Sequence, residues 1–217
     1  MPKKTIGVLA ATPVDTGMGV AVVGSAGFPH VSRYLSTTPA EQSDLQIQYK
    51  DRLTEMVAAA CIELAEKGAD HILLYCNSLA GAVDMETVCN ISPISIVTPL
   101  DVYCDLAMKY KSIALMTANG QSLAAIERII QKSNPGCAVY GSGTLPITEA
   151  IEAGKDPAEI VTDLGIRELV QAFGKMGGEI LVLACTHFPY FKDHIIEIST
   201  MPVIDPALAM LDLINQS

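Results

Sequence analysis

The sequence predicts an α/β fold of two similar pseudo-symmetric lobes, each a mostly parallel sheet flanked by helices. Two observations indicate this fold. Short apolar runs alternate with longer amphipathic segments along the chain, a pattern typical of parallel strands joined by helices. Segments of the first half also recur in the second half in the same order. We expect the active site in a cleft between the two lobes.

Seven apolar runs have the length and composition of buried strands. They are residues 5–11, 71–77, 94–97, 112–117, 137–140, 179–185 and 202–205. The amphipathic segments between them predict helices within residues 40–67, 99–110, 121–132, 157–175 and 189–198. Asp156 followed by Pro157 marks one helix start, because aspartate is a favoured N-cap and proline is tolerated at the first helical position.

Three pairs of segments form an internal repeat. TIGVLAATP resembles SIALMTANG, KGADHILLYCNS resembles MGGEILVLACTH, and SPISIVTPLDVYCDL resembles MPVIDPALAMLDL. Matched positions such as Cys76 and Cys185 lie about 107 to 109 residues apart in all three pairs, and a common period indicates a repeated structural unit. The predicted domains are a first lobe of residues 1–98 with 203–217 and a second lobe of residues 99–202.

The composition excludes several classes of protein. Half of the 217 residues are hydrophobic and 18% are charged, which is typical of a globular chain. The net charge of −10 and the lack of a Lys/Arg cluster argue against nucleic-acid binding. No apolar run is long enough to span a membrane, and none follows MPKK as a signal peptide would, so we expect a cytoplasmic protein.

Six cysteines in a reducing compartment are expected to stay thiols. No CxxC spacing occurs, so no structural zinc site is expected. Cys76 and Cys185 differ from the others because each ends a predicted strand at a matched position of the repeat, and ligands of parallel sheets bind beyond the strands' carboxyl ends. Helices expected from Ala80 and from Pro189 would favour a bound anion or a thiolate there. The remaining four are expected to be core or surface residues: Cys61, Cys89, Cys104 and Cys137.

Two opposed thiols can act on both faces of one carbon atom. One thiolate removes a proton and the opposite thiol delivers one, which inverts a stereocentre. An ordinary thiol has a pKa of about 8.5, close enough to neutrality for either protonation state to be used. Asp15, at the end of the first strand, is the candidate to tune Cys76, and His187 is the candidate to tune Cys185.

Four motifs carry a resemblance to a known family. ACTHFP at 184–189 resembles the GCTHYP motif of glutamate racemases, and YCNS at 75–78 resembles their ACNTAS motif. VDTGMG at 14–19 resembles their DSGVGG motif, and VIDPALAM at 203–210 is similar to the segment that crosses back to the first lobe. The chain therefore resembles the cofactor-independent aspartate/glutamate racemase superfamily, nearest in its motifs to glutamate racemase.

The resemblance implies a role for each matching residue. Cys76 and Cys185 would be the acid/base residues, assisted by Asp15 and His187. The implied substrate-binding residues are Thr16 and Thr186 for the amino group, Asn77 and Ser78 for the α-carboxylate, and Thr117. The resemblance also implies a small amino-acid or dicarboxylate substrate, no pyridoxal phosphate and no metal, and a homodimer. One departure is clear: the family's Pro-Tyr-Gly segment is absent, and residues 36–44 read STTPAEQSD instead.

Structural roles remain alternatives for several of these residues. Asp15 can cap a helix starting near Gly17, and Asn77, Ser78 and Thr186 can cap helices too. The glycines of DTGMG lack the GxGxxG spacing of a phosphate-binding loop. The histidines outside the motifs are expected to be structural: His30, His71 and His194.

Other functions also remain open. Hydantoin racemase or another superfamily isomerase is one alternative, although two cysteines argue against the one-cysteine relatives. A non-catalytic carboxylate-binding protein on the same scaffold is another, although pure binding needs neither thiol. A thiol-disulfide redox protein would need the two sulfurs to approach to about 2 Å. The preferred interpretation is an isomerase, a racemase acting on glutamate or aspartate.

Overall fold

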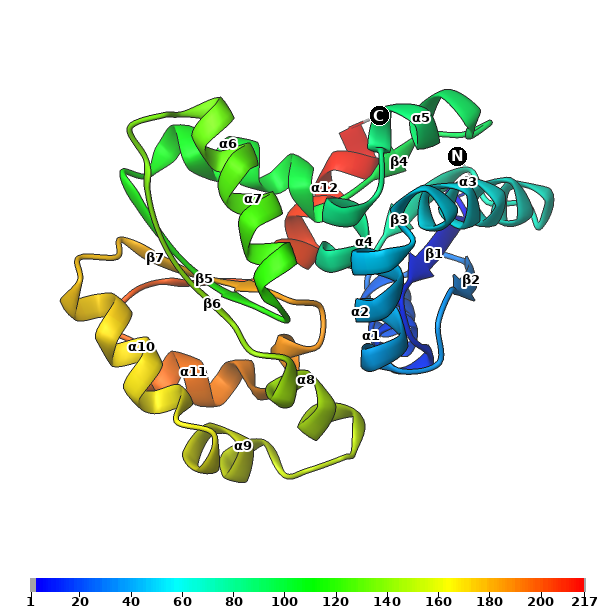
Figure 1. Cartoon of the computed structure of the whole chain (residues 1–217). Helices are drawn as coiled ribbons and strands as arrows, with labels where there is room; N and C mark the ends of the chain where they lie inside the picture. The colour runs from blue at the N-terminus through cyan, green and yellow to red at the C-terminus, as the bar shows by residue number, and fades with distance from the viewer. Residues whose placement is uncertain (1–2, 217) are drawn as a thin grey trace. The chain divides into compact units, whose positions relative to one another are not determined.

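The computed structural model describes residues 3–216 and contains two four-stranded sheets, in which every strand pair is parallel. The strand orders are β2-β1-β3-β4 and β6-β5-β7-β8, so the second sheet repeats the topology of the first. Figure 1 shows helices around each sheet. The predicted α/β fold of two similar lobes is confirmed.

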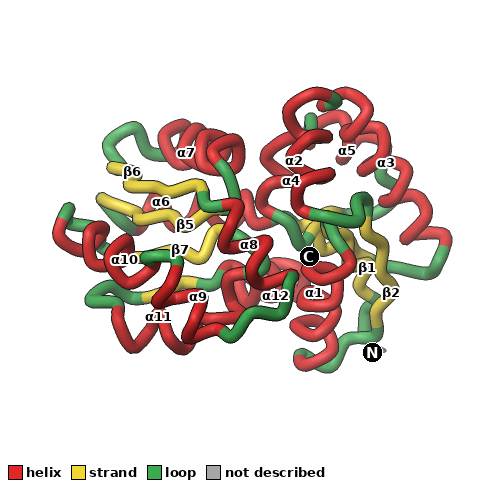
Figure 2. The backbone as a smooth tube through the Cα atoms, turned by 60° about the horizontal axis from the view of Figure 1, so that its bottom comes forward, coloured by secondary structure: helices red, strands yellow, loops and turns green. Residues whose placement is uncertain are grey.

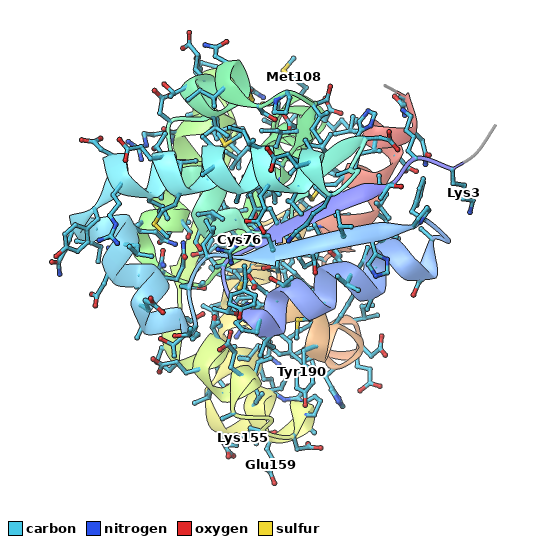
Figure 3. The ribbon with its side chains drawn as sticks, turned by 90° about the vertical axis from the view of Figure 1, so that its right-hand side faces the viewer. Lys3, Cys76, Met108, Lys155, Glu159 and Tyr190 are labelled. Atoms are coloured by element: carbon cyan, nitrogen blue, oxygen red, sulfur yellow. The ribbon has the colours of Figure 1, made fainter. Side chains whose placement is uncertain are left out.

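The described chain up to Asp101, together with the residues from Ala207 on, forms the first compact unit. Its elements are β1 (Ile6–Ala10), α1 (Pro13–Ser25), β2 (His30–Tyr34), α2 (Pro39–Gln48), α3 (Lys50–Glu66), β3 (His71–Leu74), α4 (Asn77–Ala82), α5 (Met85–Ile91), β4 (Ile96–Val97) and α12 (Pro206–Gln216). In Figure 3 the helix α3, in cyan, lies on one side of the blue strands and α1 lies on the other.

The second compact unit is Val102–Pro206. Its elements, with α6 beginning just before the boundary, are α6 (Pro99–Lys109), β5 (Ser112–Thr117), α7 (Gly120–Ser133), β6 (Ala138–Gly143), α8 (Leu145–Glu152), α9 (Pro157–Asp163), α10 (Ile166–Lys175), β7 (Ile180–Ala184), η1 (Phe188–Phe191), α11 (Lys192–Ile198) and β8 (Val203–Ile204). Figure 2 shows its yellow strands between red helices, with α7 on one side and α9 to α11 on the other.

The domain boundaries between residues 98 and 99 and between residues 202 and 203 remain predictions. The compact units change over at Asp101 and at Pro206. Val203 pairs with Leu181 and Ile204 with Val182, so β8 belongs to the second sheet.

The central strands are buried on both faces, which explains their unbroken apolar sequences. Every residue of β1, β5 and β7 is buried. Parallel strands covered by helices on both sides need such runs because neither face meets water. No helix in the described part of the chain is both long and apolar enough to cross a membrane.

Several elements differ from the sequence-based expectation. β2 was not predicted, because its residues alternate between exposed and half-buried at the edge of the sheet. The segment 40–67 is two helices, since α2 ends and α3 begins at Tyr49. The segment 157–175 is also two helices, separated at Gly165, whose φ of +67° suits glycine. α5 and α8 were not predicted.

Candidate active site

Cys76 lies at the carboxyl edge of the first sheet. It lies two residues after the end of β3, is the N-cap residue of α4 and is 4% exposed. Its Sγ lies 3.4 Å from the hydroxyl oxygen of Ser78. Figure 3 shows Cys76 at one end of the blue strands and Lys3, which precedes β1, at the other. The strand is shorter than the predicted residues 71–77, and the buried thiol lies just beyond its end.

Asp15 is a helix-capping residue at the same edge. Its Oδ1 accepts hydrogen bonds from the backbone N–H of Thr12 at 2.7 Å and from the Thr12 hydroxyl at 3.1 Å, while the Thr12 hydroxyl oxygen accepts from the Asp15 N–H at 3.4 Å. This reciprocal capping box starts α1 at Pro13, four residues earlier than expected. The Oδ2 atom of Asp15 accepts from the N–H of Ala11 at 3.3 Å. Its carboxylate is fully buried and held in a fixed direction.

Gly19 has a packing reason for being glycine. A Cβ atom there would lie 2.8 Å from Val8 Cγ1 and 2.9 Å from the ring of Tyr75, closer than real Cβ contacts. Gly17 would meet nothing within 4 Å. The second glycine of the DTGMG motif therefore lets α1 approach the strands closely, which brings Asp15 to the edge of the sheet that carries Cys76.

Cys185 lies at the corresponding edge of the second sheet. It follows β7, is 4% exposed, and has two side-chain neighbours at hydrogen-bonding range for sulfur. These are the hydroxyl of Thr148 at 3.8 Å and Nδ1 of His187 at 3.7 Å. His187 was a candidate because of its motif, whereas Thr148 was not a candidate.

The imidazole of His187 joins Cys185 to a carboxylate. Its Nε2 lies 2.8 Å from Oε1 of Glu152, and both side chains are largely buried. A hydrogen bond to the carboxylate favours the proton on Nε2, so Nδ1 faces the sulfur with its lone pair in the neutral imidazole. An imidazole held in this way can take the thiol proton and return it, and the carboxylate stabilises the imidazolium that forms.

Helix α8 brings Thr148 and Glu152 to this site. They are four residues apart and therefore share one face of the helix. Sequence reasoning missed Glu152 because α8 itself was not predicted. The signal was present in LPITEAIE, where a proline near the start and polar residues four apart indicate a helix with one polar stripe on its buried side.

Tyr103 is a further buried group near Cys185. It lies on α6 and is fully buried, and burial raises the pKa of its phenol well above the ordinary value. The negative charges of Cys185 and Asp205 raise the pKa further. Tyr103 therefore stays neutral, and Asp205 also lies 3.6 Å from the ammonium of Lys192.

The other candidate residues lie at the two sheet edges. Thr16 donates its hydroxyl hydrogen bond to the Thr12 carbonyl at 2.7 Å. Thr117 ends β5 beside Ala184 and donates to backbone carbonyls of Ser142 at 2.7 Å and Asn119 at 3.0 Å. The structure thus places the candidates of each unit at one sheet edge: Asp15, Thr16, Cys76, Asn77 and Ser78 in the first unit, and Thr117, Cys185, Thr186 and His187 in the second.

The expected helix after Cys185 is wrong in its type. Residues 188–191 form a four-residue 3-10 helix, and the α-helix begins only at Lys192. The helix after Cys76 begins at Asn77 and has six residues. Short helices carry small dipoles, so the polar groups next to the Cys185 sulfur are the His187 imidazole and the Thr148 hydroxyl.

The remaining cysteines differ from this pair in their surroundings. Burial raises the pKa of Cys61 to about 12, and burial also raises the pKa values of Cys89 and Cys137. Such thiols are poor nucleophiles and poor bases at neutral pH. None of the six cysteines, all within the described chain, forms a disulfide.

Two parallel sheets with one strand order, each with a buried cysteine within two residues of the end of its third strand, define a class of α/β proteins built from a duplicated unit. The family model described as Asp/Glu/Hydantoin racemase matches residues 18–214, and the chain belongs to that family.

Two curated relatives are glutamate racemases. The protein of Desulforudis audaxviator is 23% identical over 152 residues, and that of Limosilactobacillus reuteri (strain DSM 20016) is 25% identical over 163 residues. These matches cover 67% and 73% of this chain, and they span only 55% and 60% of the relatives' own lengths.

Solved structures share the fold. Glutamate racemase from Francisella tularensis in complex with D-glutamate has a TM-score of 0.77 at 18% identity, over 100% of this chain and 81% of that one. An aspartate racemase homologue from Pyrococcus horikoshii has a TM-score of 0.70 at 17% identity, over 100% and 99% of the two chains.

Proposed function

We propose that this protein is a pyridoxal-phosphate-independent amino-acid racemase that acts on glutamate or aspartate and uses Cys76 and Cys185 as its two acid/base residues. The family supports an amino-acid racemase, which is an isomerase, and the glutamate racemases among its relatives support a small amino-acid substrate. The observation that carries the proposal is the buried series from Cys185 through His187 to Glu152.

The proposed reaction moves one proton off and another onto the α-carbon. One thiolate takes the α-proton, and the electron pair of the broken C–H bond delocalises into the α-carboxylate. The other thiol then donates its proton to the opposite face of the carbon, which gives the other enantiomer and leaves that cysteine as a thiolate. Each turnover therefore exchanges the protonation states of the two cysteines, and the next substrate of opposite hand restores them.

The neighbours of each thiol support these roles. His187 can hold the proton of Cys185 while Glu152 stabilises the imidazolium. The carboxylate therefore lowers the free-energy cost of burying the thiolate and imidazolium charges. The Ser78 hydroxyl beside Cys76 can donate a hydrogen bond to that thiolate. In this proposal Asp15, Thr16, Asn77, Ser78, Thr117 and Thr186 bind and orient the amino and α-carboxylate groups.

The test is proton exchange in deuterium oxide. The protein is incubated separately with L-glutamate, L-aspartate and a 5-substituted hydantoin, and the α-proton NMR signal is followed together with optical rotation. We expect exchange with loss of optical activity for one amino acid. Cys76→Ala and Cys185→Ala should abolish racemisation, whereas Cys104→Ser, a change at an exposed cysteine, should not.

Exchange with the hydantoin alone would replace the amino-acid reading by a hydantoin racemase. Exchange with none of the three by folded, reduced protein would contradict the racemase proposal. A cytoplasmic location and a homodimer stay predictions, and the second is checked by light scattering of the purified chain.

A further inference from the structure

Thr148 is a buried helical threonine whose hydroxyl is not bonded to its own helix. Three other helical threonines, Thr16, Thr54 and Thr162, donate to the carbonyl four residues earlier, at 2.7, 3.1 and 2.9 Å. Within the described chain, the one hydrogen-bond partner of the Thr148 hydroxyl is the sulfur of Cys185, at 3.8 Å. This hydroxyl is therefore committed to the thiol and not to the helix backbone.

The pair of His187 and Glu152 sets the direction of the hydrogen bonds at this sulfur. The carboxylate of Glu152, 2.8 Å from Nε2 of His187, favours the proton on that nitrogen. Nδ1 then presents its lone pair to Cys185 at 3.7 Å, so the thiol directs its proton to the imidazole. With that proton used, the sulfur can only accept from Thr148, and the Thr148 hydroxyl is the donor.

Loss of the thiol proton strengthens this hydrogen bond. A donor bonds about twice as strongly to a charged acceptor as to a neutral one, so the hydroxyl stabilises the Cys185 thiolate more than the thiol. The titratable groups near the sulfur are the His187 imidazole, the Glu152 carboxylate behind it, and Tyr103 of α6, whose phenol pKa is raised further by the charge of Cys185. Thr148 differs from all three because its hydroxyl carries no charge and does not titrate.

Each of the two candidate thiols has one hydroxyl neighbour, but the hydroxyls have different sources. Ser78 lies two residues after Cys76, and its hydroxyl oxygen is 3.4 Å from that sulfur. The residue two positions after Cys185 is His187, so the matched position of the second unit holds an imidazole. There the hydroxyl comes from Thr148 on α8. A hydroxyl beside the sulfur in both units supports a role for it in the chemistry of the thiol.

We propose that Thr148 is a positioning residue that donates its hydroxyl hydrogen bond to the Cys185 thiolate and thereby keeps this cysteine available as a base. The use of the thiolate as a base rests on the proposed function, whereas the hydrogen bond itself does not. Without the hydroxyl, the buried thiolate keeps only the imidazole as a hydrogen-bond donor. Loss of one such bond to a charged group should lower the ratio of thiolate to thiol about tenfold.

The test measures the Cys185 thiolate directly. Its ultraviolet absorbance is the difference between each protein and the same protein carrying Cys185→Ala, followed from neutral to alkaline pH. Thr148→Val replaces the hydroxyl by a methyl group, and Thr148→Ser keeps the hydroxyl without the methyl group. At a given pH we expect a ratio of thiolate to thiol about tenfold lower in Thr148→Val and within about twofold of wild type in Thr148→Ser. Thr162→Val, which removes an exposed helical hydroxyl, is the matched control and should keep the wild-type ratio.

Kinetics give a second measurement where the wild-type protein racemises its substrate. Thr148→Val should lower kcat/KM about tenfold, because less of the free enzyme carries the thiolate. The loss should be equal for the two enantiomers, since the equilibrium constant of a racemisation is one. Thr148→Ala is a second variant without the hydroxyl, and circular dichroism identifies which of the two variants is folded.

The outcomes separate this inference from the proposed function. A lowered thiolate ratio in Thr148→Val, when the wild-type protein exchanges no α-proton, would support the hydrogen bond and overturn the racemase. A wild-type ratio in the folded variants without the hydroxyl would overturn the role of Thr148 and leave the racemase standing. Equal losses in Thr148→Val and Thr148→Ser would also overturn it, because they would trace the effect to side-chain packing and not to the hydroxyl.

Discussion

His187 and Glu152 lie 35 residues apart in the sequence, and their side chains meet with 2.8 Å between Nε2 and Oε1. The contact is largely buried, so solvent screens it little. It fixes the rotation of the imidazole and therefore the direction from which Nδ1 faces Cys185. The Glu152 carboxylate thus controls the orientation of the imidazole that faces the sulfur.

Replacing Glu152 by Gln should slow racemisation without unfolding the protein. The amide keeps a hydrogen-bonding oxygen near Nε2 but no longer stabilises the imidazolium, so proton transfer at Cys185 loses its electrostatic support. We expect kcat to fall by about a hundredfold, within the usual range for assistance to an acid/base group. Initial rates with each enantiomer measure it, and Glu149→Gln, an exposed change on the same helix, is the control. Equal rates in wild type and Glu152→Gln would show that Glu152 is only structural.

Asp15 can be tested for capping and catalysis separately. Asp15→Asn keeps an oxygen that accepts the Thr12 N–H, so the capping geometry of α1 is largely retained. Thr12→Val removes the N-cap hydroxyl and should lower the free energy of unfolding by about 1 kcal/mol. We expect Asp15→Asn to lose most activity while Thr12→Val retains it. Denaturant unfolding and proton exchange on both variants supply the comparison, and full activity in Asp15→Asn would leave capping as the only role.

The two glycines of DTGMG should respond oppositely to alanine. Gly19→Ala places a methyl group 2.8 Å from Val8 and 2.9 Å from Tyr75, and overpacking of this kind costs about 1–3 kcal/mol. Gly17→Ala meets open space within α1 and should stabilise the protein by about 0.5–1 kcal/mol, because alanine loses less backbone entropy in a helix. Midpoints of chemical denaturation measure both changes. A Gly19→Ala protein as stable as wild type would contradict the close packing of α1.

His71 should make the stability depend on pH. Burial lowers the pKa of its imidazole below 6.5, the charge of Lys4 lowers it further, and Asp70 opposes the shift. The unfolded chain therefore takes up a proton near pH 6.5 that the folded protein binds only at lower pH. The contribution of His71 to the free energy of unfolding is present above pH 6.5. It is lost as the pH falls through the pKa of the imidazole in the folded protein.

His71→Phe should flatten this part of the stability profile. His30→Phe is a matched control, because His30 and His71 both pair with Ile6 in neighbouring strands and His30 is exposed. Urea unfolding at pH 5 to 8 measures the three profiles. If the stability profiles of the wild-type protein and His71→Phe run parallel across this pH range, the pKa of the His71 imidazole is not lowered by folding.

Strands with apolar runs could be predicted from the sequence. An edge strand without such a run could not be predicted. Residues 112–117 were predicted as a strand with the bounds that β5 has, because burial on both faces demands an unbroken apolar run. The edge strand β2 has no such run, because it lies at the end of the sheet and its residues are exposed or half-buried. Propensity and periodicity carry little information there.

The same distinction applies to the candidate site. Cys76, Cys185 and His187 could be chosen because they follow strands and lie in a repeat or a motif. Glu152 and Thr148 come from a helix whose depth in the fold depends on tertiary packing.

The duplicated topology within one polypeptide has an evolutionary consequence. In a two-fold symmetric dimer of identical half-length chains, every substitution appears on both subunits, so the two copies of a site must remain alike. After fusion into one chain, each copy can change alone. Cys76 and Cys185 stand at matched positions of the repeat and have different neighbours, a serine hydroxyl beside the first and a histidine imidazole beside the second. Divergence of this kind permits the two proton-transfer steps to be assisted by chemically distinct groups.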